Sequence, residues 1–392
     1  MHDTITEAEG ATDPESHCRN PEGPTLWEAM EARRLRFHRK PFLDDTPMSP
    51  NTPARFRKVD FHVPRLRKCP FDLETVDWRH AKLLGAGMDG CVWRVRFGDY
   101  SPYYALKLFW DADPAVLYQS YFAAQRECQN AALVQAIRAS VDQEAEAQAV
   151  LDAGGTLPDD NGPGAAPTLV FPDPQDENEA VSNLYSFSVE IRRDRHKFAH
   201  LDAPETMRLR DVPMPRFVQC YGWLRVDAEE LIARMPRRCQ PDPIHIKRKE
   251  FRYFQKGPTE FIAIVYEYIH KEGGDDGEGD RDSFKTTTVG QEQRAVRPST
   301  LRQRQPAKEK PTKEKLTKEQ PEKEKPPDDE RDRVAAVETF LYLAGFQFCP
   351  QPLRRNWVNG VLVDHSDIIG PRFFGWHKRY YRLRSTEVLL SE

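Results

Sequence analysis

The stretch LLGAGMDGCVWRVRFGDYSPYYALKLFW, residues 83–110, decides the fold. It contains Gly85, Gly87 and Gly90 at G-x-G-x-x-G spacing, and Lys107 follows them. Glycines at this spacing occur in more than one kind of phosphate-binding loop, so the residues after them must identify the fold. A dinucleotide-binding unit would begin a helix at the third glycine, and a P-loop would need Gly-Lys-Ser or Gly-Lys-Thr, which is absent.

The residues after the third glycine have the pattern of a β-hairpin. Apolar residues alternate with arginines in CVWRVRF, residues 91–97, and a period of two predicts a strand. Gly98-Asp99 predicts a turn, and YYALKLFW, residues 103–110, predicts a second strand. The glycines therefore belong to a turn inside a hairpin, and the next strand carries the lysine.

This arrangement resembles that of protein kinases, which have G-x-G-x-x-G-x-V and then a strand with A-x-K. Val92 completes the first motif, and Ala105 and Lys107 give the second. Glycines let backbone N–H groups come close to phosphate oxygens, because they carry no side chain. Ala105 would leave room for a base, and Lys107 on the same strand face would reach phosphates. We expect these residues and the three glycines to form the ATP site, if a nucleotide binds.

The next element is expected to be a helix that carries a buried glutamate. Residues 113–114, Asp-Pro, suit a helix start. Glu127 lies on the same helical stripe as Ala131 and Val134. Because a glutamate on an apolar stripe needs a cation, we expect an ion pair with Lys107, like the lysine–glutamate pair of kinases. The alternative is that Glu127 is a solvated helix residue.

Three further stretches complete the kinase-like pattern. QCYGWLRV, residues 219–226, and IAIVYEYIH, residues 262–270, predict two more strands. Glu267 and Ile269 would lie in the hinge beside an adenine base. VLVDHSD stands where kinases have Asp-Phe-Gly, so Asp364 is the candidate magnesium ligand if Mg-ATP binds. The expected fold is α+β, with a five-stranded antiparallel small lobe, one main helix and a much reduced large lobe.

The sequence lacks groups that transfer phosphate in protein kinases. Their catalytic loop, H-R-D-x-x-x-x-N, supplies an aspartate that orients the attacking hydroxyl and an asparagine that holds metal. Between Asp332 and Asp364 the chain has no aspartate, and its only carboxylate is Glu338. The chain also ends too soon after Asp364 for a full large lobe. We therefore predict no catalytic residue and favour a protein that is not an enzyme, with an atypical ATP-dependent kinase as the alternative.

Composition divides the chain into ordered and loose parts. With 32 prolines and 31% charged residues in 392, it cannot bury enough apolar surface to order every residue. We expect a mostly disordered arm over 1–70, the small lobe over 71–271 with a disordered insertion at 140–180, a disordered linker over 272–330 and the reduced C-terminal lobe over 331–392. The linker contains Lys/Glu/Pro pentads, whose prolines block a continuous helix.

Cysteine use and hydropathy indicate an intracellular protein. The seven cysteines contain no C-x-x-C pair, so neither a zinc site nor a disulfide framework is predicted. The start, MHDTITEAEG, lacks the pattern of a secretory signal. No apolar run approaches the roughly 20 residues that span a bilayer. We therefore expect a soluble, nuclear or cytoplasmic protein with no membrane partner.

Basic stretches raise the alternative of nucleic-acid binding. ARRLRFHRKPF, residues 32–42, and ARFRKVDFHVPRLRK, residues 54–68, lie in the arm, and GPRFFGWHKRYYRLR, residues 370–384, lies near the end. Aromatic rings there could stack on bases while cations meet phosphates. The interpretation that we favour is that Phe373, Phe374 and Trp376 close the core, with the basic residues outside.

Five stretches together resemble a fungal family, the kinetochore Sim-four complex subunits of the Fta-two type. In chain order they are WRHAKLLGAGMDGCVWRVRFG, YALKLFW, QRECQNAALV, RFVQCYGWLRV and WVNGVLVDHSDIIGPRFFGW. The resemblance implies a kinase-like small lobe with a shortened remainder. It also implies an inner-kinetochore subunit of a fungal nucleus, a pseudokinase module that acts through protein partners. The insertions at 140–180 and 272–330 depart from the family's pattern.

Overall fold

The computed structural model describes most of the chain outside its charged linker. It covers residues 25–49, 55–112, 121–156, 167–193, 206–246, 250–252, 260–271, 328–350 and 354–391. Most of the expected linker, residues 272–327, lies outside these ranges, and so does the helix start expected at residues 113–114.

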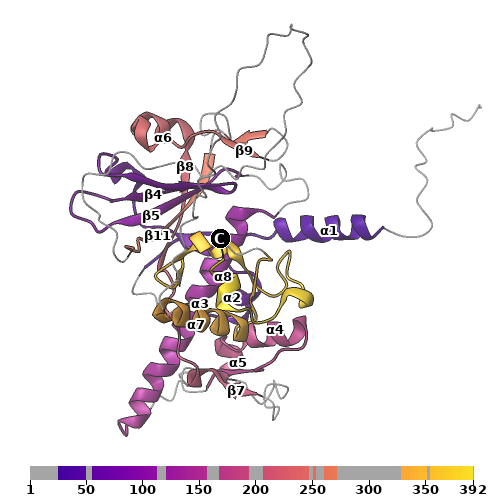
Figure 1. The fold of residues 1–392 in the computed structure, drawn as a ribbon. Helices are drawn as coiled ribbons and strands as arrows, with labels where there is room; N and C mark the ends of the chain where they lie inside the picture. Colours follow the sequence, from indigo (N-terminus) through magenta and orange to yellow (C-terminus); the bar gives the residue numbers. More distant parts are fainter. Residues whose placement is uncertain are drawn as a thin grey trace, which may run out of the picture.

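A seven-stranded mixed sheet forms the upper layer of the molecule (Figure 1). Its order is β1-β2-β8-β11-β5-β4-β3. The five strands from β8 to β3 are antiparallel to their neighbours, whereas β1 is parallel to β2, and β2 to β8. The α+β class is therefore confirmed, and the sheet has seven strands rather than five because the parallel strands β1 and β2 extend the five antiparallel ones. The strands are β1 (Leu43–Pro47), β2 (Leu66–Lys68), β3 (Lys82–Ala86), β4 (Gly90–Val95), β5 (Tyr104–Phe109), β8 (Cys220–Asp227) and β11 (Glu260–Glu267).

Alternation along the strands gives this sheet two apolar faces. On one face Trp93 and Leu106 pack in a cluster with Leu231, which belongs to α6 (Ala228–Arg234). On the other face Ile264 packs in a cluster with Ala131, which belongs to α3 (Ala123–Asp152). Residues of β5 that alternate with Leu106 therefore face α3, and Lys107 is one of them.

Helix α3 is the main helix, and it is longer than expected. It runs from beneath the sheet into the lower half of the molecule, and its C-terminal end projects beyond that half (Figure 1). Residues 140–152 continue the helix and 167–180 also contain regular structure, so the disorder expected over 140–180 is not found over these residues. The reason is local burial: Glu144 accepts hydrogen bonds from the backbone N–H and the hydroxyl of Thr168, at 3.0 and 2.8 Å.

Residues 25–49 and 55–70 differ in the same way from the disordered arm that we expected. They contribute two helices besides β1 and β2, namely α1 (Leu26–His38) and α2 (Lys58–His62). Phe37, Phe61 and Leu66 are buried, the last two with 1% and 0% exposure. These few apolar side chains anchor the segment. Because arginines and lysines outnumber them, the composition of the segment alone predicts disorder.

A third apolar cluster holds the lower half together. It contains Phe61 of the arm, Leu133 of α3, Phe340 and Trp376, so the C-terminal part shares its core with the arm and α3. No helix among the described residues is both long and apolar enough to cross a membrane. The remaining helices are α4 (Glu177–Tyr185), α5 (Val189–Arg193), α7 (Asp328–Leu343) and α8 (Thr386–Leu389). The remaining strands are β6 (Leu169–Val170), β7 (Met207–Arg208), β9 (Ile244–Ile246), β10 (Glu250–Arg252), β12 (Gln347–Phe348), β13 (Trp357–Val358), β14 (Val361–Leu362) and β15 (Ile368–Ile369).

Candidate functional site

A buried cluster of three charged side chains joins the sheet, α3 and the segment after β14. The Lys107 ammonium on β5 lies 2.5 Å from Glu127 Oε2 on α3 and 2.8 Å from Asp364 Oδ1. The side chains of Lys107 and Glu127 are 9% and 0% exposed, and that of Asp364 is 25% exposed. The ion pair that the sequence predicts between Lys107 and Glu127 is present, and Asp364 joins it.

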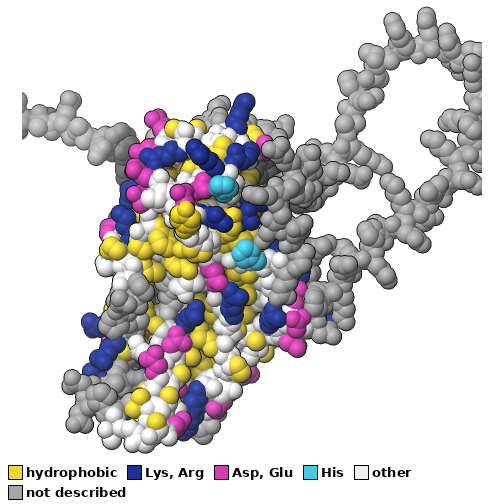
Figure 2. All heavy atoms as spheres, turned by 90° about the vertical axis from the view of Figure 1, so that its left-hand side faces the viewer, with side chains coloured by type: hydrophobic (Ala, Val, Ile, Leu, Met, Phe, Trp, Pro, Cys, Tyr) yellow, Lys and Arg dark blue, Asp and Glu magenta, His cyan; other side chains and the backbone are white. Residues whose placement is uncertain are grey.

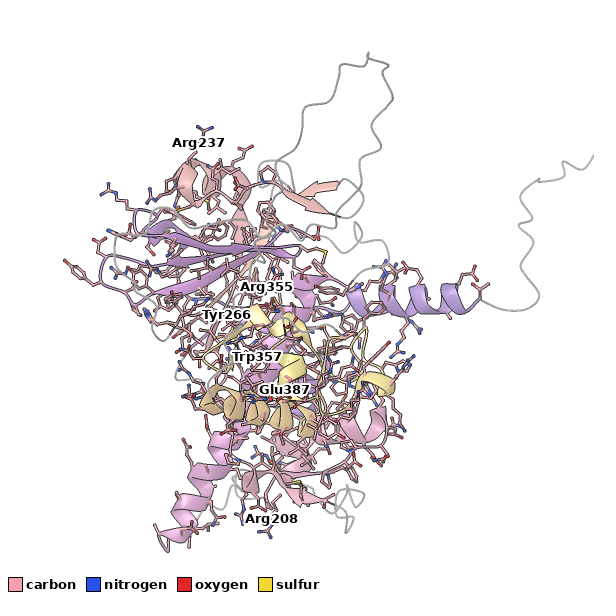
Figure 3. The ribbon with its side chains drawn as sticks, viewed as in Figure 1. Arg208, Arg237, Tyr266, Arg355, Trp357 and Glu387 are labelled. Atoms are coloured by element: carbon pink, nitrogen blue, oxygen red, sulfur yellow. The ribbon has the colours of Figure 1, made fainter. Side chains whose placement is uncertain are left out.

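Hydrogen bonds from neutral groups hold the two carboxylates. The Tyr266 hydroxyl donates to Glu127 Oε1 at 3.1 Å. The backbone N–H and the hydroxyl of Ser366 donate to Asp364 Oδ1 at 3.0 and 2.6 Å. Tyr266 belongs to β11, so this bond reaches Glu127 from the sheet, and Figure 3 labels Tyr266 above Trp357 of the C-terminal part. The cluster is thus fixed from the sheet side and from the C-terminal side.

The three groups shift one another's pKa values. Burial lowers the pKa of Lys107, but the two carboxylates outweigh it and raise that pKa. Burial raises the pKa of Asp364, but Lys107 and Ser366 outweigh it and hold that pKa well below its ordinary value. Burial raises the pKa of Glu127 to about 8, against the attraction of Lys107, which it shares with Asp364. Asp364 therefore holds its negative charge more firmly than Glu127 does.

The three glycines of the loop have different surroundings. A Cβ on Gly90 would lie 1.9 Å from the carbonyl oxygen of Leu108, so the close approach of β4 to β5 requires glycine there. A Cβ on Gly85 or Gly87 would meet no atom within 4 Å. The packing of the hairpin thus explains Gly90 and gives no reason for the other two.

Hydrogen bonds hold the tip of the glycine loop. Trp110 Nε1 donates to the carbonyl of Gly87 at 2.8 Å, and the Tyr121 hydroxyl donates to Asp89 Oδ2 at 2.5 Å. Burial raises the pKa of Asp89, and the Tyr121 bond and the charge of Lys107 oppose that shift. A carboxylate at the tip brings negative charge toward the lysine, where the phosphates of a nucleotide would lie. It weakens nucleotide binding unless a cation screens it.

Val92 and Ala105 lie on the sheet face that carries Lys107. Val92 is the register partner of Lys107 between β4 and β5, and both Val92 and Ala105 are half-buried. Arg94 is the register partner of Ala105, and its guanidinium lies 4.3 Å from the ring centre of Tyr103. The sequence analysis missed this arginine–tyrosine contact, although the alternation of β4 places Arg94 on this face.

The two expected hinge residues lie apart from the charged cluster. The Glu267 carboxylate is 2.5 Å from the Arg216 guanidinium and also accepts the backbone N–H of Gln219 at 3.3 Å. Ile269 is half-buried against the apolar cluster on the α3 side of the sheet. Glu267 is therefore engaged in an ion pair at the end of β11, and its backbone N–H also donates to the carbonyl of Gln219 at 2.8 Å.

No carboxylate stands at the position of a catalytic base before Asp364. In H-R-D-x-x-x-x-N the aspartate precedes the asparagine by five residues. Gln351 stands five residues before Asn356, and Arg354 stands five residues before Asn359. Neither position can supply a catalytic base, because neither an amide nor a guanidinium can take a proton from a hydroxyl group.

Other candidate acids and bases near this segment are occupied or neutral. Asp367 Oδ2 accepts a hydrogen bond from Asn356 Nδ2 at 2.7 Å. Glu338 accepts the backbone N–H of Arg384, and burial raises its pKa to about 7. Burial lowers the pKa of His365 to about 4, so this ring is uncharged at neutral pH. Both ring nitrogens of His365 lack a hydrogen-bond partner within the described part of the chain.

Asp364 is the only sequence-predicted metal ligand. Its Oδ1 accepts hydrogen bonds from Lys107 and Ser366, and its side chain also interacts with that of Glu127. Over the described ranges, no group of three or more His, Cys, Asp or Glu side chains is arranged to hold a metal ion. A magnesium ion at Asp364 would therefore need further oxygens from a bound nucleotide, whose phosphates it would bridge and neutralise.

The C-terminal basic stretch closes the core, as the favoured interpretation predicts. Phe373 and Trp376 are both 5% exposed, and Phe374 is half-buried. Arg384 donates to the backbone carbonyls of Cys349 and Phe348 at 2.7 and 2.8 Å. On another face of the molecule, over the sheet, Lys and Arg side chains are mixed with Asp and Glu (Figure 2). A face of mixed sign is not the single-sign surface that nucleic-acid backbones favour.

Comparison with known proteins adds no relative. No protein-family model, no curated protein and no solved structure matches this chain. Its function is therefore inferred from its own residues, their motifs and their geometry.

Proposed function

We propose that this chain is a catalytically inactive, protein-kinase-like module that acts by binding other proteins. The observation that carries the proposal is the cluster of Lys107, Glu127 and Asp364, with ion-pair distances of 2.5 and 2.8 Å. Active protein kinases need a lysine–glutamate pair and a metal-binding aspartate. This chain has residues of those types together, while Gln351 and Arg354 occupy the offsets of a catalytic aspartate.

The cluster has a structural role that needs no nucleotide. Lys107 directs one N–H group to Glu127 and one to Asp364, so it ties β5 to α3 and to the segment after β14. Breaking a buried ion pair by removing one partner typically costs 3–5 kcal/mol, because the other charge is left uncompensated. A scaffold held in this way presents its surfaces rigidly, which suits a binding module.

Features around the glycine loop act in opposite directions on nucleotide binding. The open space in front of Gly85 and Gly87, and the negative charge of Asp364, favour a magnesium–nucleotide complex. The Asp89 carboxylate and its bond to Tyr121 oppose it. In our proposal the module works without phosphoryl transfer, whether or not a nucleotide is bound.

The partner class that we propose is a nuclear protein assembly of the kinetochore type. This part rests on the resemblance of five sequence stretches to the fungal family named above. The alternative of an atypical kinase would need a carboxylate within reach of a substrate hydroxyl group.

The proposal is tested by the location of the tagged chain in its source cell. We expect nuclear foci that coincide with centromeres, for the wild type and for Asp364→Asn, which keeps the shape of the side chain. A diffuse cytoplasmic signal would contradict the kinetochore part. Foci that are lost in Asp364→Asn at equal protein level would contradict a role without magnesium–nucleotide chemistry.

A further inference from the structure

Residues of three basic stretches, which are far apart in the sequence, come together near one tyrosine. Lys40 follows α1, Lys58 and His62 belong to α2, and Arg372 belongs to the C-terminal segment. Lys58, His62 and Arg372 lie at Tyr185, at the end of α4, and Lys40 lies within electrostatic reach of His62 and Arg372. Helix α4 and the C-terminal segment lie on the same side of the molecule, below α1 (Figure 1). We call these four residues and the tyrosine the Tyr185 basic cluster.

Three side chains of the cluster point toward Tyr185 from different parts of the chain. The Lys58 ammonium is 5.2 Å and the Arg372 guanidinium 5.9 Å from the centre of the Tyr185 ring. His62 Nδ1 is 2.8 Å from the Tyr185 hydroxyl. Tyr185 is only 8% exposed, whereas Lys58, His62 and Arg372 are exposed. The buried tyrosine ring is therefore covered by two cationic side chains and a histidine, which are open to solvent.

The cationic groups act on one another. Burial and the charge of Arg372 lower the pKa of Lys40. Burial lowers the pKa of His62, and the charges of Lys40, Arg372 and Lys58 lower it further. The charges of Lys40, Lys58 and Arg372 repel one another, and an anion would relieve the repulsion. The cluster is therefore built for a ligand of negative charge.

Carboxylates beside the cluster hold its backbone. Glu177 accepts the backbone N–H of Arg372 at 3.1 Å, and its other contact is with Arg33 at 3.7 Å. Glu190 accepts the backbone N–H of Lys58 at 2.8 Å. These two carboxylates therefore hold the backbone of Lys58 and of Arg372.

Lys40 and Arg372 have no carboxylate ion-pair partner among the residues that the structure describes. Arg372 also has a φ of +66°, in the left-handed region that glycine and asparagine usually occupy. A long cationic side chain at such a position is unfavourable for the backbone, and strain of this kind gathers at functional sites. Both observations indicate that Arg372 serves a ligand rather than the fold.

We propose that the Tyr185 basic cluster binds the phosphomonoester group of a phosphorylated protein partner. Two ammonium groups and a guanidinium would donate charge-assisted hydrogen bonds to its oxygens. If the tyrosine hydroxyl donates to His62 Nδ1, the neutral ring keeps an N–H group at Nε2 as a further donor. The site is separate from the glycine loop, so the inference stands whether or not a nucleotide binds there.

The compactness of the cluster favours a phosphomonoester over a nucleic acid. A phosphomonoester carries up to two negative charges on one group. A nucleic-acid backbone spreads single charges along its length, and proteins meet it with extended basic rows or grooves. Here the cationic groups of Lys58 and Arg372 lie at one ring, with Lys40 within electrostatic reach of Arg372, which matches one concentrated charge.

The first experiment uses the full chain and inorganic phosphate. Its thermal midpoint is measured with rising phosphate at constant ionic strength, for the wild type, Arg372→Gly and Lys378→Ala. Lys378 is an exposed lysine of the same segment outside the cluster, so its variant is the matched control. We expect phosphate to raise the midpoint of the wild type and the control but not of Arg372→Gly. Because glycine relieves the positive φ, we expect Arg372→Gly to fold with an unchanged or higher midpoint without phosphate.

The second experiment identifies the source of the phosphate. Anisotropy compares a labelled degenerate peptide library with a central phosphoserine, the same library with serine, and a single-stranded oligonucleotide, at physiological ionic strength. We expect phosphoserine to bind at least about tenfold more tightly than serine, and Arg372→Gly and Lys40→Ala each to weaken it at least about tenfold. Phosphate effects that persist in Arg372→Gly, equal binding of both libraries, or tighter binding of the oligonucleotide would each overturn the proposal.

Discussion

Replacing Lys107 by methionine tests the structural role of the charged cluster. Methionine has a similar length and keeps the apolar packing of the stem, so the change removes mainly the ammonium. The carboxylates of Glu127 and Asp364 would then lie buried without their cation, at sites where the ammonium was 2.5 and 2.8 Å away. Such a loss typically costs about 3–5 kcal/mol of unfolding free energy.

This cost is large enough to measure by thermal unfolding. For chains of this size one kcal/mol corresponds to about 2–4 °C, so we expect the midpoint of Lys107→Met to fall by about 6–20 °C. Lys82→Met is the matched control, because Lys82 is an exposed lysine of the same sheet on β3. Its midpoint should stay within about 2 °C of the wild type.

A second substitution separates charge from packing. Glu127→Gln, added to Lys107→Met, removes one of the stranded carboxylates while it keeps the shape of the side chain. We expect the double variant to lose less stability than the two single variants together, by about 0.5–3 kcal/mol. A Lys107→Met midpoint close to that of the wild type, or strict additivity, would refute the argument that the ammonium holds the two carboxylates.

Further predictions concern the loop and the titration of the cluster. Gly90→Ala would place a Cβ 1.9 Å from the Leu108 carbonyl oxygen, so we expect a loss of about 1–3 kcal/mol in urea unfolding. Gly87→Ala, whose Cβ meets nothing within 4 Å, should change stability by less than about 0.5 kcal/mol. Equal effects of the two would contradict the packing argument. The pKa of Glu127 rises on folding from 4.5 to about 8, so the folded state holds more protons between these values and stability falls as pH rises. Midpoints measured from pH 5 to 8 should therefore fall for the wild type relative to Glu127→Gln, and a parallel pair of curves would contradict this. Tyr121→Phe removes the hydrogen bond to the loop-tip carboxylate and should cost about 1 kcal/mol, which the same urea assay measures; an unchanged midpoint would show that the bond does not stabilise the fold.

The glycine stretch let the sequence predict the central hairpin and the buried pair. Alternation of apolar residues and arginines after Gly90 required a strand, and a lysine on the next strand needed an acid in reach. Glu127 was identifiable because it shares a helical stripe with apolar residues. These predictions rest on patterns of short period, which act locally and survive in a single sequence.

The two parallel strands and the ordered arm were not predictable by the same means. Phe61 and Leu66 are isolated apolar residues among arginines, lysines and histidines, and only the three-dimensional fold reveals the core into which they pack. The continuation of α3 through residues 140–152 depends on contacts such as that of Glu144 with Thr168, across a gap that composition suggests is loose. Long-range partners of this kind leave no periodic signal in the sequence.

The sequence does not predict that Lys40, Lys58, His62 and Arg372 lie close together, for the same reason. Each basic stretch was visible, and each was interpreted by itself as a disordered arm or a solvated surface. Only the packing of α2, α4 and the C-terminal segment places them around Tyr185.

Phosphoryl transfer is the measurement that tests the central claim most directly. Purified full chain is incubated with γ-labelled Mg-ATP, and labelled phosphate is followed into the chain, a generic protein acceptor and water, for the wild type and Asp364→Asn. The absence of a catalytic carboxylate predicts that the wild type transfers no more label than Asp364→Asn. Transfer by the wild type that Asp364→Asn abolishes, with its thermal midpoint unchanged, would contradict the claim and make the protein an atypical kinase.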